Sequence, residues 1–333
     1  MLKYGIIGAG RLGNVHAGNI VAMENAKLAG VFDIDDAHAK AMAEKYGADV
    51  YASAEDLAKA VDAVVVASPS DCHRLGVEAA VNAGKPVFSE KPFCRDGADR
   101  DRLVKLLTGY GKPYGIGFVR RHMRKTQLLK SLLDDNAIGK LKFCNVDLPF
   151  GGFKRMYGDW FADYRRSGGV ILDMLAHHID LANFFFGRPV RVFAQGMMLD
   201  ASQALPSDYV SSTVTYANGV IVNFMCTWQR FGRSGEMMEI YGDKGCLTMC
   251  GDEFLTHSEL GKDTVKINAN EADAIGVSNM KTGSGFANEI AAFTEAVEKG
   301  GAYTPSLAEG IASFAVADGM MKSAETNKVI ELA

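Results

Sequence analysis

The sequence has no long apolar run. Of its 333 residues 48% are hydrophobic and 23% are charged, which is the composition of a globular protein. No stretch approaches the roughly 20 consecutive apolar residues that cross a bilayer. The start, Met1–Gly8, meets glycine too early for a signal peptide. We therefore expect a cytoplasmic protein without membrane attachment, long enough for two domains.

An excess of one charge and a cysteine motif are also missing. Lys and Arg total 36 against 40 Asp and Glu, a net charge of -4, so nucleic acid and anionic membranes are not expected partners. The six cysteines form no Cys-x-x-Cys pair, and the loose Cys246/Cys250 pair lacks a second pair or a nearby histidine. We expect six reduced thiols and no metal site.

The first third of the chain alternates short apolar runs with amphipathic stretches. Expected strands cover Leu2–Ile7, Ala26–Phe32, Asp62–Ala67, Lys85–Phe88 and Lys112–Phe118. Expected helices cover Gly10–Met23, Asp36–Tyr46, Ala54–Ala60, Cys72–Ala83 and Ala98–Leu107. This alternation predicts an α/β fold, a doubly wound parallel sheet over residues 1–120.

After residue 120 the pattern changes to α+β. Asn218-Gly219, flanked by β-branched residues, predicts a hairpin with a type I′ turn. The remaining expected elements are a helix over Met123–Asp134, strands over Lys140–Asp147, Glu236–Tyr241 and Gly245–Met249, helices over Phe286–Glu298 and Leu307–Lys322, and a strand over Val329–Leu332. Residues 251–285 carry no readable pattern. We expect a second domain over 121–333 with a large, mostly antiparallel sheet.

A glycine-rich loop joins the first expected strand to the first expected helix. Gly8-Ala9-Gly10-Arg11-Leu12-Gly13 matches G-x-G-x-x-G, which is weak alone but stands where a dinucleotide site requires it. Gly8 permits the tight turn, Gly10 lets a pyrophosphate approach, and Gly13 lets helix and strand pack closely. The free amides of Arg11 and Leu12 then face the phosphates at the helix N-terminus.

Asp33 ends the second expected strand, twenty residues after Gly13. A carboxylate there accepts both ribose hydroxyls of NAD and repels the 2′-phosphate of NADP. The alternative is a solvated acid that heads the next helix, although Asp35 or Asp36 can serve as that cap. We expect NAD, with NADP the lesser alternative.

Two further loops follow apolar strands, where ligands of such folds bind. One is Ser68-Pro69 with His73 at the start of the next helix, and the other is Glu90-Lys91-Pro92. Lys91 either points toward the nicotinamide or is a solvated loop lysine, and position alone does not separate these two possibilities.

A second group of ionisable residues follows Gly168-Gly169 in an apolar segment that runs to about Phe186. Asp173, His177 and Asp180 are spaced four and three apart, which predicts one shared helix face. Oxidation of an alcohol needs a base, and histidine with a carboxylate partner suits that task. A structural role is the alternative for each, and it is the interpretation we give to His178 and His16.

Together these motifs resemble the glucose–fructose oxidoreductase, inositol dehydrogenase and rhizopine-catabolism (Gfo/Idh/MocA) family. The match includes a closing helix with Phe286, Glu289 and Phe293. The resemblance implies a catalytic group of Lys91, Asp173 and His177, in which Lys91 stabilises charge on the reacting oxygen and His177 is the general acid/base. It also implies a sugar-like or polyol substrate and a homodimer or homotetramer formed through the second sheet. Leu175 departs from the family, which often has a small residue there.

Several polar and aromatic residues are candidates for holding the substrate. They are Arg120, Arg121, His122, Trp160, Asp163, Tyr164, Arg165 and Arg166, together with Lys91, Asp173 and His177. Arg165 and Arg166 suggest an acidic sugar. In that case their replacement by Ala raises KM for a sugar acid and spares a neutral polyol.

Two other functions remain open. A non-catalytic NAD-binding regulator needs the glycine loop and Asp33, but has no use for Lys91, Asp173 and His177 together. A metal-dependent lyase or hydrolase would use Asp173, His177 and Asp180 as ligands, although metals normally gather ligands from several elements. Hydride transfer to or from a hydroxyl-bearing carbon is the function that the motifs favour.

Overall fold

The computed structural model describes residues 1–149, 160–199, 206–229, 235–251, 254–268 and 284–332. Its contacts group into two compact units. The first comprises Met1–Val119 with Gly283–Ile311, and the second Arg120–Thr282 with Ala312–Ala333. The segment Gly283–Ile311 therefore belongs by its contacts to the first unit, although it lies inside the expected second domain.

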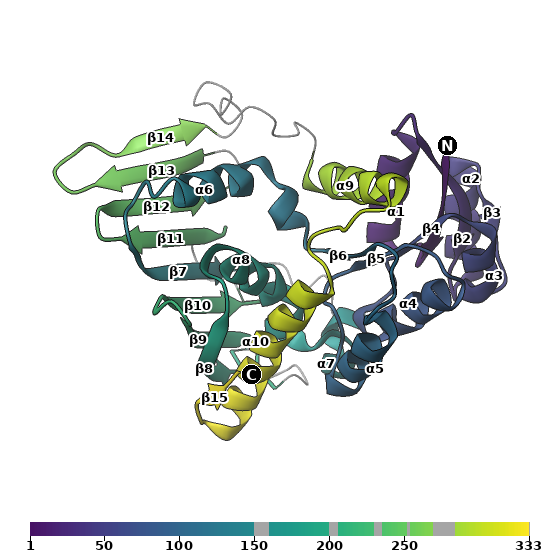
Figure 1. Cartoon of the computed structure of the whole chain (residues 1–333). Coiled ribbons are helices and arrows are strands. Elements are labelled where there is room, and N and C mark those ends of the chain that lie inside the picture. The colour runs from purple at the N-terminus through teal and green to yellow at the C-terminus, as the bar shows by residue number, and fades with distance from the viewer. Residues whose placement is uncertain (150–159, 200–205, 230–234, 252–253, 269–283, 333) are drawn as a thin grey trace. The chain divides into compact units, whose positions relative to one another are not determined.

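The first unit contains a six-stranded parallel sheet in the order β3-β2-β1-β4-β5-β6 (Figure 1). This is the strand order of the dinucleotide-binding doubly wound fold, so the predicted fold class is confirmed. The strands are β1 Leu2–Ile7, β2 Ala26–Phe32, β3 Asp49–Val50, β4 Ala63–Val66, β5 Val87–Glu90 and β6 Tyr114–Gly117.

Helices cover this sheet in two layers. The helix α1 contacts α2 and α9, while α4 contacts α3 and α5. The helices are α1 Arg11–Val21, α2 Asp36–Tyr46, α3 Ala54–Ala60, α4 His73–Asn82, α5 Gly97–Leu107 and α9 Gly285–Lys299. With helices on both sides, β4 is buried throughout, and its sequence Ala-Val-Val-Val suits a strand without a solvated face. The core includes Phe293 of α9, far along the chain.

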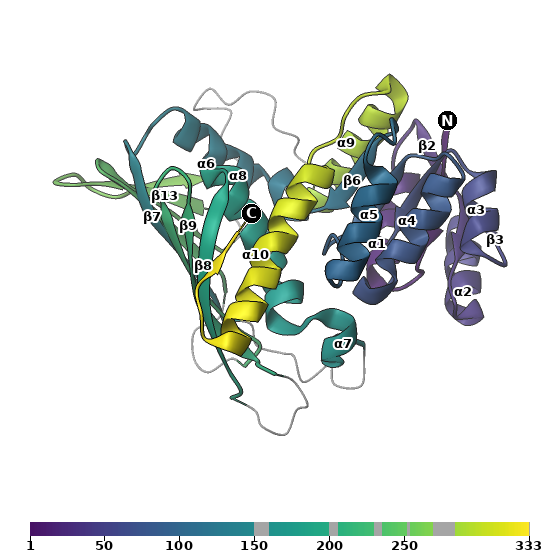
Figure 2. The same ribbon diagram turned by 60° about the horizontal axis from the view of Figure 1, so that its bottom comes forward.

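The second unit contains a nine-stranded sheet in the order β14-β13-β12-β11-β7-β10-β9-β8-β15 (Figures 1 and 2). Only the β7–β10 pair is parallel among these described strands, as expected for an α+β domain. The strands are β7 Leu141–Pro149, β8 Pro189–Met197, β9 Tyr209–Tyr216, β10 Ile221–Thr227, β11 Met237–Gly242, β12 Gly245–Cys250, β13 Phe254–Glu259, β14 Val265–Asn268 and β15 Ile330–Glu331.

Helices cover one face of this sheet. The helix α6 contacts β12 and β13. In α10, Ser323 Oγ accepts from the backbone N–H of Ala194 at 2.8 Å. The helices are α6 Arg124–Asp134, α7 Tyr164–Ser167, α8 Ala176–Phe186 and α10 Leu307–Thr326, with a π-helix over Val170–Leu175. Strands such as β9 and β10 accordingly alternate buried and accessible residues.

The predicted hairpin joins β9 and β10, but its turn is not type I′. Only Gly219 has a positive φ (86°), whereas a type I′ turn requires one at Asn218 as well. The N–H of Gly219 donates to the carbonyl of Tyr216, and the N–H of Tyr216 donates to the carbonyl of Val220. The loop therefore has three residues and ends in a left-handed glycine, the other common way to close a hairpin.

Two further observations concern the expected location of the protein. All six cysteines lie in the described residues and are free thiols. Within the described residues, no helix combines the length and apolar content that a membrane crossing requires.

Candidate active site

The glycine-rich loop packs against the strand beside it. Gly8 has φ +101°, and a Cβ there would lie 2.5 Å from the backbone nitrogen of Ser68. A Cβ on Gly13 would lie 2.0 Å from the carbonyl oxygen of Gly8. A Cβ on Gly10, in contrast, would meet no described atom within 4 Å. Two glycines thus serve packing, and the third leaves the backbone open on the side where a pyrophosphate would approach.

Asp33 braces this loop. Its Oδ2 accepts from the backbone N–H of Ala9 at 2.6 Å, and its Oδ1 accepts from the N–H of Asp35 at 2.8 Å. The cap of α2 is Asp35, whose Oδ1 accepts from the N–H of Ala37 at 2.9 Å. Asp33 is therefore not the helix cap. Each carboxylate oxygen has further lone pairs, so the side chain fits the ribose hydroxyls of NAD.

His73 connects the two loops that follow β4 and β5. It is 2% exposed, with Nε2 2.9 Å from the carbonyl oxygen of Ser68 and Nδ1 3.1 Å from that of Pro92. Burial lowers the pKa of His73, and the two carbonyl oxygens and Glu90 oppose that shift. A neutral imidazole donates only one of these bonds. The contacts make His73 a brace for the Lys91 loop.

Glu90 and Lys91 stand where β5 ends. The Glu90 side chain is buried, its Oε1 lies 2.7 Å from Nε2 of His16, and its Oε2 accepts from the backbone N–H of Lys91 at 3.2 Å. Because β5 adjoins β4 and β4 adjoins β1, the first unit gathers the glycine loop, the Ser68 loop and Lys91 at the carboxyl ends of neighbouring strands. Ligands of such sheets bind at this edge.

In the second unit, Asp173 and His177 lie on either side of the junction between a π-helix and the α-helix α8. Asp173 belongs to the π-helix and is 7% exposed, while His177 lies in the first turn of α8. The prediction that Asp173, His177 and Asp180 share one face assumed a regular α-helix. It is wrong in that respect, because a π-helix has i→i+5 hydrogen bonds and turns less per residue. Between Val170 and Ala182 only Met174 and His177 are not buried.

Asp180 holds its helix in place. Its two oxygens accept from Nε and Nη2 of Arg121, each at 2.7 Å, and both side chains are buried. The Arg121 guanidinium also lies 4.7 Å from the ring centre of Phe184. Both residues were candidates for substrate or metal binding. This bidentate pair gives them a structural role instead.

Glu236 was not singled out in the sequence, yet it contacts two cationic side chains and a buried histidine. It forms ion pairs with Arg120 and Lys125, the latter at 2.9 Å, and its Oε2 lies 3.3 Å from Nε2 of His178. Burial raises the pKa of Glu236, but these partners outweigh it and hold that pKa far below its usual range. No local pattern reveals this role, because the partners of Glu236 lie more than fifty residues away in the sequence. The expected substrate residue Arg120 is thus one member of a buried network.

The segment before the π-helix carries the remaining candidates. Arg165 is 89% exposed and pairs with Asp163 at 3.5 Å, and Trp160 stacks on Phe161. Hydrogen bonds from Arg165 lower the pKa of the Asp163 carboxyl. Nothing in these contacts selects an acidic sugar, which stays a prediction for Arg165 and Arg166.

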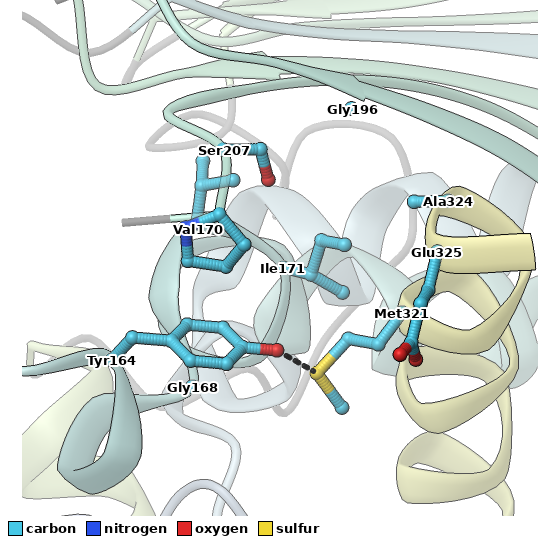
Figure 3. A pocket seen from close by; sticks show the side chains of 10 residues that line it. Tyr164, Gly168, Val170, Ile171, Gly196, Ser207, Met321, Ala324 and Glu325 are labelled. Atoms are coloured by element: carbon cyan, nitrogen blue, oxygen red, sulfur yellow. Dashed lines mark hydrogen bonds between the residues drawn. The ribbon is translucent and has the colours of Figure 1, made fainter. Parts of the chain in front are cut away.

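Tyr164 lines a pocket of about 340 Å³ inside the second unit (Figure 3). Its hydroxyl donates to Sδ of Met321 at 3.5 Å. The lining residues are Tyr164, Gly168, Val170, Ile171, Gly196, Pro206, Ser207, Met321, Ala324 and Glu325. The pocket borders the start of the π-helix, and its lining includes neither Asp173 nor His177.

The strand order, the open backbone at Gly10 and the acid at Asp33 define an NAD-binding oxidoreductase of the Rossmann class. The family described as "Oxidoreductase family, NAD-binding Rossmann fold" matches residues 2–118, and the "GFO/IDH/MocA C-terminal domain" matches residues 126–248. The chain belongs to the Gfo/Idh/MocA oxidoreductase family, as the motifs predicted.

Curated relatives and solved structures agree with this assignment. The chain is 29% identical to an inositol 2-dehydrogenase of Rhizobium meliloti, over 100% of this chain and 99% of that protein. It is 31% identical to a myo-inositol 2-dehydrogenase of Thermotoga maritima, over 73% and 74%. A putative myo-inositol dehydrogenase from Sinorhizobium meliloti superposes with TM-score 0.80 at 27% identity, covering both chains fully. Levoglucosan dehydrogenase with NADH and levoglucosan reaches 0.88 at 20% identity over 99% of both chains, which shows the shared fold.

Proposed function

We propose that the chain oxidises a CH–OH carbon of a sugar, inositol or related polyol, with NAD as hydride acceptor, or catalyses the reverse reduction. The observation that carries the proposal is the placement of Lys91 at the carboxyl end of β5, on the sheet edge that also bears the nucleotide loop. A regulator that only binds NAD has no need of an amine there. The similarity to two inositol dehydrogenases supports a polyol substrate.

The catalytic roles follow from the chemistry of each group. Oxidation breaks the O–H and C–H bonds of the alcohol and forms a carbonyl. The glycine loop and Asp33 would hold NAD, which would supply the hydride acceptor. His177 takes the hydroxyl proton with Asp173 as its charge partner, and the Lys91 amine stabilises negative charge on the reacting oxygen. In the reverse direction His177 returns the proton.

The π-helix supports these roles for Asp173 and His177. Single π turns within helices are rare and frequently mark functional sites. His177 retains solvent access inside an otherwise buried stretch, which a proton-transfer group requires and a core histidine does not. The remaining substrate contacts are assigned to Arg120, Trp160, Arg165 and Arg166. Ser68, Pro69, His73 and Glu90 complete the cofactor loops.

The competing functions have less support. A metal site of Asp173, His177 and Asp180 is disfavoured by the buried Asp180–Arg121 pair, because a metal cation bound to Asp180 would lie beside the positive charge of the guanidinium. The non-catalytic regulator remains the alternative if no substrate is turned over.

We further propose that residues 1–120 bind the dinucleotide, that residues 121–333 bind substrate, and that the chain forms a cytoplasmic homodimer or homotetramer through its second sheet. The face of that sheet opposite its helices carries accessible apolar side chains, including Ile221 (42% exposed) and Phe143 (38%). Such residues on the central strands β7 and β10 of an open sheet favour a second copy as cover.

The proposed activity is tested with a substrate panel of inositols, aldoses, sugar acids and dihydrodiols, with NAD and NADP in parallel and NADH absorbance as readout. We expect turnover of at least one polyol or sugar with NAD and a lower kcat/KM with NADP. The sugar acids test Arg165 and Arg166 through their Ala variants. NADH binding without turnover of any compound would favour the regulator.

A further inference from the structure

Three ionisable side chains meet in the core of the first unit. His16 of α1 and Glu289 of α9 are 0% exposed, and Glu90 at the end of β5 is 3% exposed. One nitrogen or oxygen atom from each lies within 4.8 Å of the other two. Charged groups are rarely buried without partners, so this cluster demands an explanation.

The contacts within the cluster are unequal. Glu90 has two: His16 Nε2 at 2.7 Å and the backbone N–H of Lys91 at 3.2 Å. Neither carboxyl oxygen of Glu289 has a hydrogen-bond partner among the described residues. The surroundings are apolar, since the His16 ring meets the rings of Phe88 and Phe286 edge-on at 5.3 and 6.0 Å.

Charge balance decides which groups are ionised. Two carboxylates and one imidazolium would leave a net negative charge in a desolvated core, which is strongly unfavourable. An un-ionised acid at one of the two carboxyl positions lowers the negative charge of the cluster by one. Burial raises the pKa of Glu289 well above its usual range, and the charge of Glu90 raises it further. Glu289 is thus the group that keeps its proton.

We propose that Glu289 is a buried neutral carboxylic acid which, together with His16, holds the Glu90 carboxylate against the Lys91 backbone and is therefore a positioning residue for the lysine. The proposal rests on the catalytic role assigned to Lys91 above. The path is short: one carboxyl oxygen of Glu289 lies within 4.8 Å of one of Glu90, and Glu90 Oε2 accepts from the backbone N–H of Lys91.

The other elements around Glu90 support this arrangement. In β6, Gly117 has no side chain, and a Cβ there would lie 3.1 Å from Oε2 of Glu90, so the carboxylate occupies that space. From α4, His73 faces the same loop, and Glu90 and Lys91 act on its pKa in opposite directions. Among the described residues, the titratable groups around Glu90 include His16, whose Nε2 lies 2.7 Å from Oε1, and His73, on whose pKa Glu90 and Lys91 act.

Infrared difference spectroscopy tests the state of Glu289 without any need for activity. We compare wild type with Glu289→Gln at pH 8, and use Glu298→Gln, an exposed acid on the same helix, as the matched control. We expect the carbonyl band of an un-ionised carboxylic acid to vanish in Glu289→Gln alone. If the wild type lacks that band, the proposal is overturned.

The pH dependence of stability gives a second readout. An acid whose pKa is higher in the folded protein makes its full contribution to the free energy of unfolding below its unfolded pKa of about 4.3. That contribution is lost as the pH rises toward the folded pKa. The Tm of the wild type should therefore fall relative to that of Glu289→Gln as the pH rises from 5 to 8. A constant difference in Tm over this range contradicts a neutral Glu289.

Metal analysis separates the proposal from a cation site made of the same three residues. We expect no stoichiometric metal in the purified protein, either before or after incubation with zinc or manganese. One equivalent bound by wild type and lost in Glu289→Gln would overturn the proposal.

The positioning role is tested by comparing Glu289→Ala with Glu289→Gln on whichever substrate the panel identifies. We expect Ala to lower kcat about tenfold with the Kd for NADH within about twofold, and Gln, a neutral isostere, to restore most of the lost kcat. Equal kcat in both variants, or a loss of NADH affinity in place of kcat, would contradict it. Absence of wild-type turnover would defeat the proposed function and leave the infrared and unfolding results to decide the state of Glu289.

Discussion

Lys91 and His177 have different kinds of support at the level of single residues. The Lys91 backbone is fixed by Glu90, and the next residue, Pro92, is fixed through its carbonyl by His73. The support for His177 is its partial exposure among mostly buried neighbours and the π-helix that precedes it. Asp180, close in sequence, is instead committed to Arg121. Residue type and spacing could not separate Asp180 from His177, because the partner of Asp180, Arg121, lies 59 residues away in the sequence.

Replacement of either catalytic candidate should impair chemistry more than cofactor binding. We expect Lys91→Ala and His177→Ala to lower kcat by about 10²–10⁴-fold, since each removes a group that acts on the transition state. The Kd for NADH, measured by fluorescence titration, should change little. Lys112→Ala and His38→Ala, at exposed positions, are the controls. Near wild-type kcat in both catalytic variants would refute the assignment.

At the level of elements, the glycines of the loop before α1 have two different tasks, packing and ligand access. Gly13 lets α1 contact the loop, and Gly10 leaves the loop open outward. The same residue type thus serves stability at one position and ligand access at another.

This division predicts different outcomes for two substitutions of the same size. Gly13→Ala should lower the free energy of unfolding by about 1–3 kcal/mol, because its methyl group overlaps the Gly8 carbonyl. Gly10→Ala should cost under about 1 kcal/mol, yet weaken NAD binding about tenfold. Chemical denaturation and NADH titration measure the two effects. Equal losses of stability would contradict the packing argument.

The network around Glu236 ties α8 to the start of the second unit through His178, Arg120 and Lys125. A carboxyl group whose pKa is lower in the folded protein stabilises the fold at any pH above its unfolded pKa of about 4.3. This stabilisation is lost as the pH falls from that value to the folded pKa. Burial lowers the pKa of His178, so acid also opposes the neutral histidine. The lowered pKa values of Glu236 and His178 both predict that the free energy of unfolding decreases at acidic pH.

Glu236→Gln should therefore lower the free energy of unfolding by about 3 kcal/mol at pH 7, since it leaves buried cations without a counter-charge. The difference from wild type should shrink as pH falls below about 4. Urea unfolding at several pH values provides the measurement, and Glu259→Gln, in a surface ion pair with Lys262, is the control. A pH-independent difference would show that Glu236 acts through packing alone.

At the level of the whole molecule, the second sheet offers its open face to another copy. Asn145, Thr213 and Asn223 form a side-chain hydrogen-bonded row across β7, β10 and β9 on this face, and Phe143 stacks on Tyr241 at 4.5 Å. A surface that combines polar and apolar side chains in this way suits an interface between identical sheets.

Ile221→Lys places a charge at the start of the central strand β10 on this face and should dissociate the assembly, because burying an unpaired ammonium is costly. Sedimentation velocity should then show monomer where the wild type shows dimer or tetramer. Leu260→Lys, at a fully exposed turn residue, is the matched control. An unchanged sedimentation coefficient for Ile221→Lys would place the interface elsewhere.

The sequence alone determined the elements whose signals are local. Alternating apolar runs and glycine punctuation predicted the parallel sheet, and Gly8–Gly13 with Asp33 predicted the cofactor, because turns, caps and buried strands are encoded within a few residues. Strands β13 and β14 went unpredicted, since Phe254–Glu259 and Val265–Asn268 carry mixed polar residues. Such strands are stabilised by packing against the strands with which they pair, so their own sequences need no alternation of apolar and polar residues.

Only the tertiary structure decided which ionisable residues are partners. It paired Asp180 with Arg121, brought Arg120, Lys125 and His178 to Glu236, and placed Glu289 close to Glu90 and His16. It also replaced the first turn of a regular helix with a π-helix at Asp173. These outcomes depend on the free energy of burying charge, which is set by neighbours brought together from distant parts of the chain and not by residues adjacent in sequence.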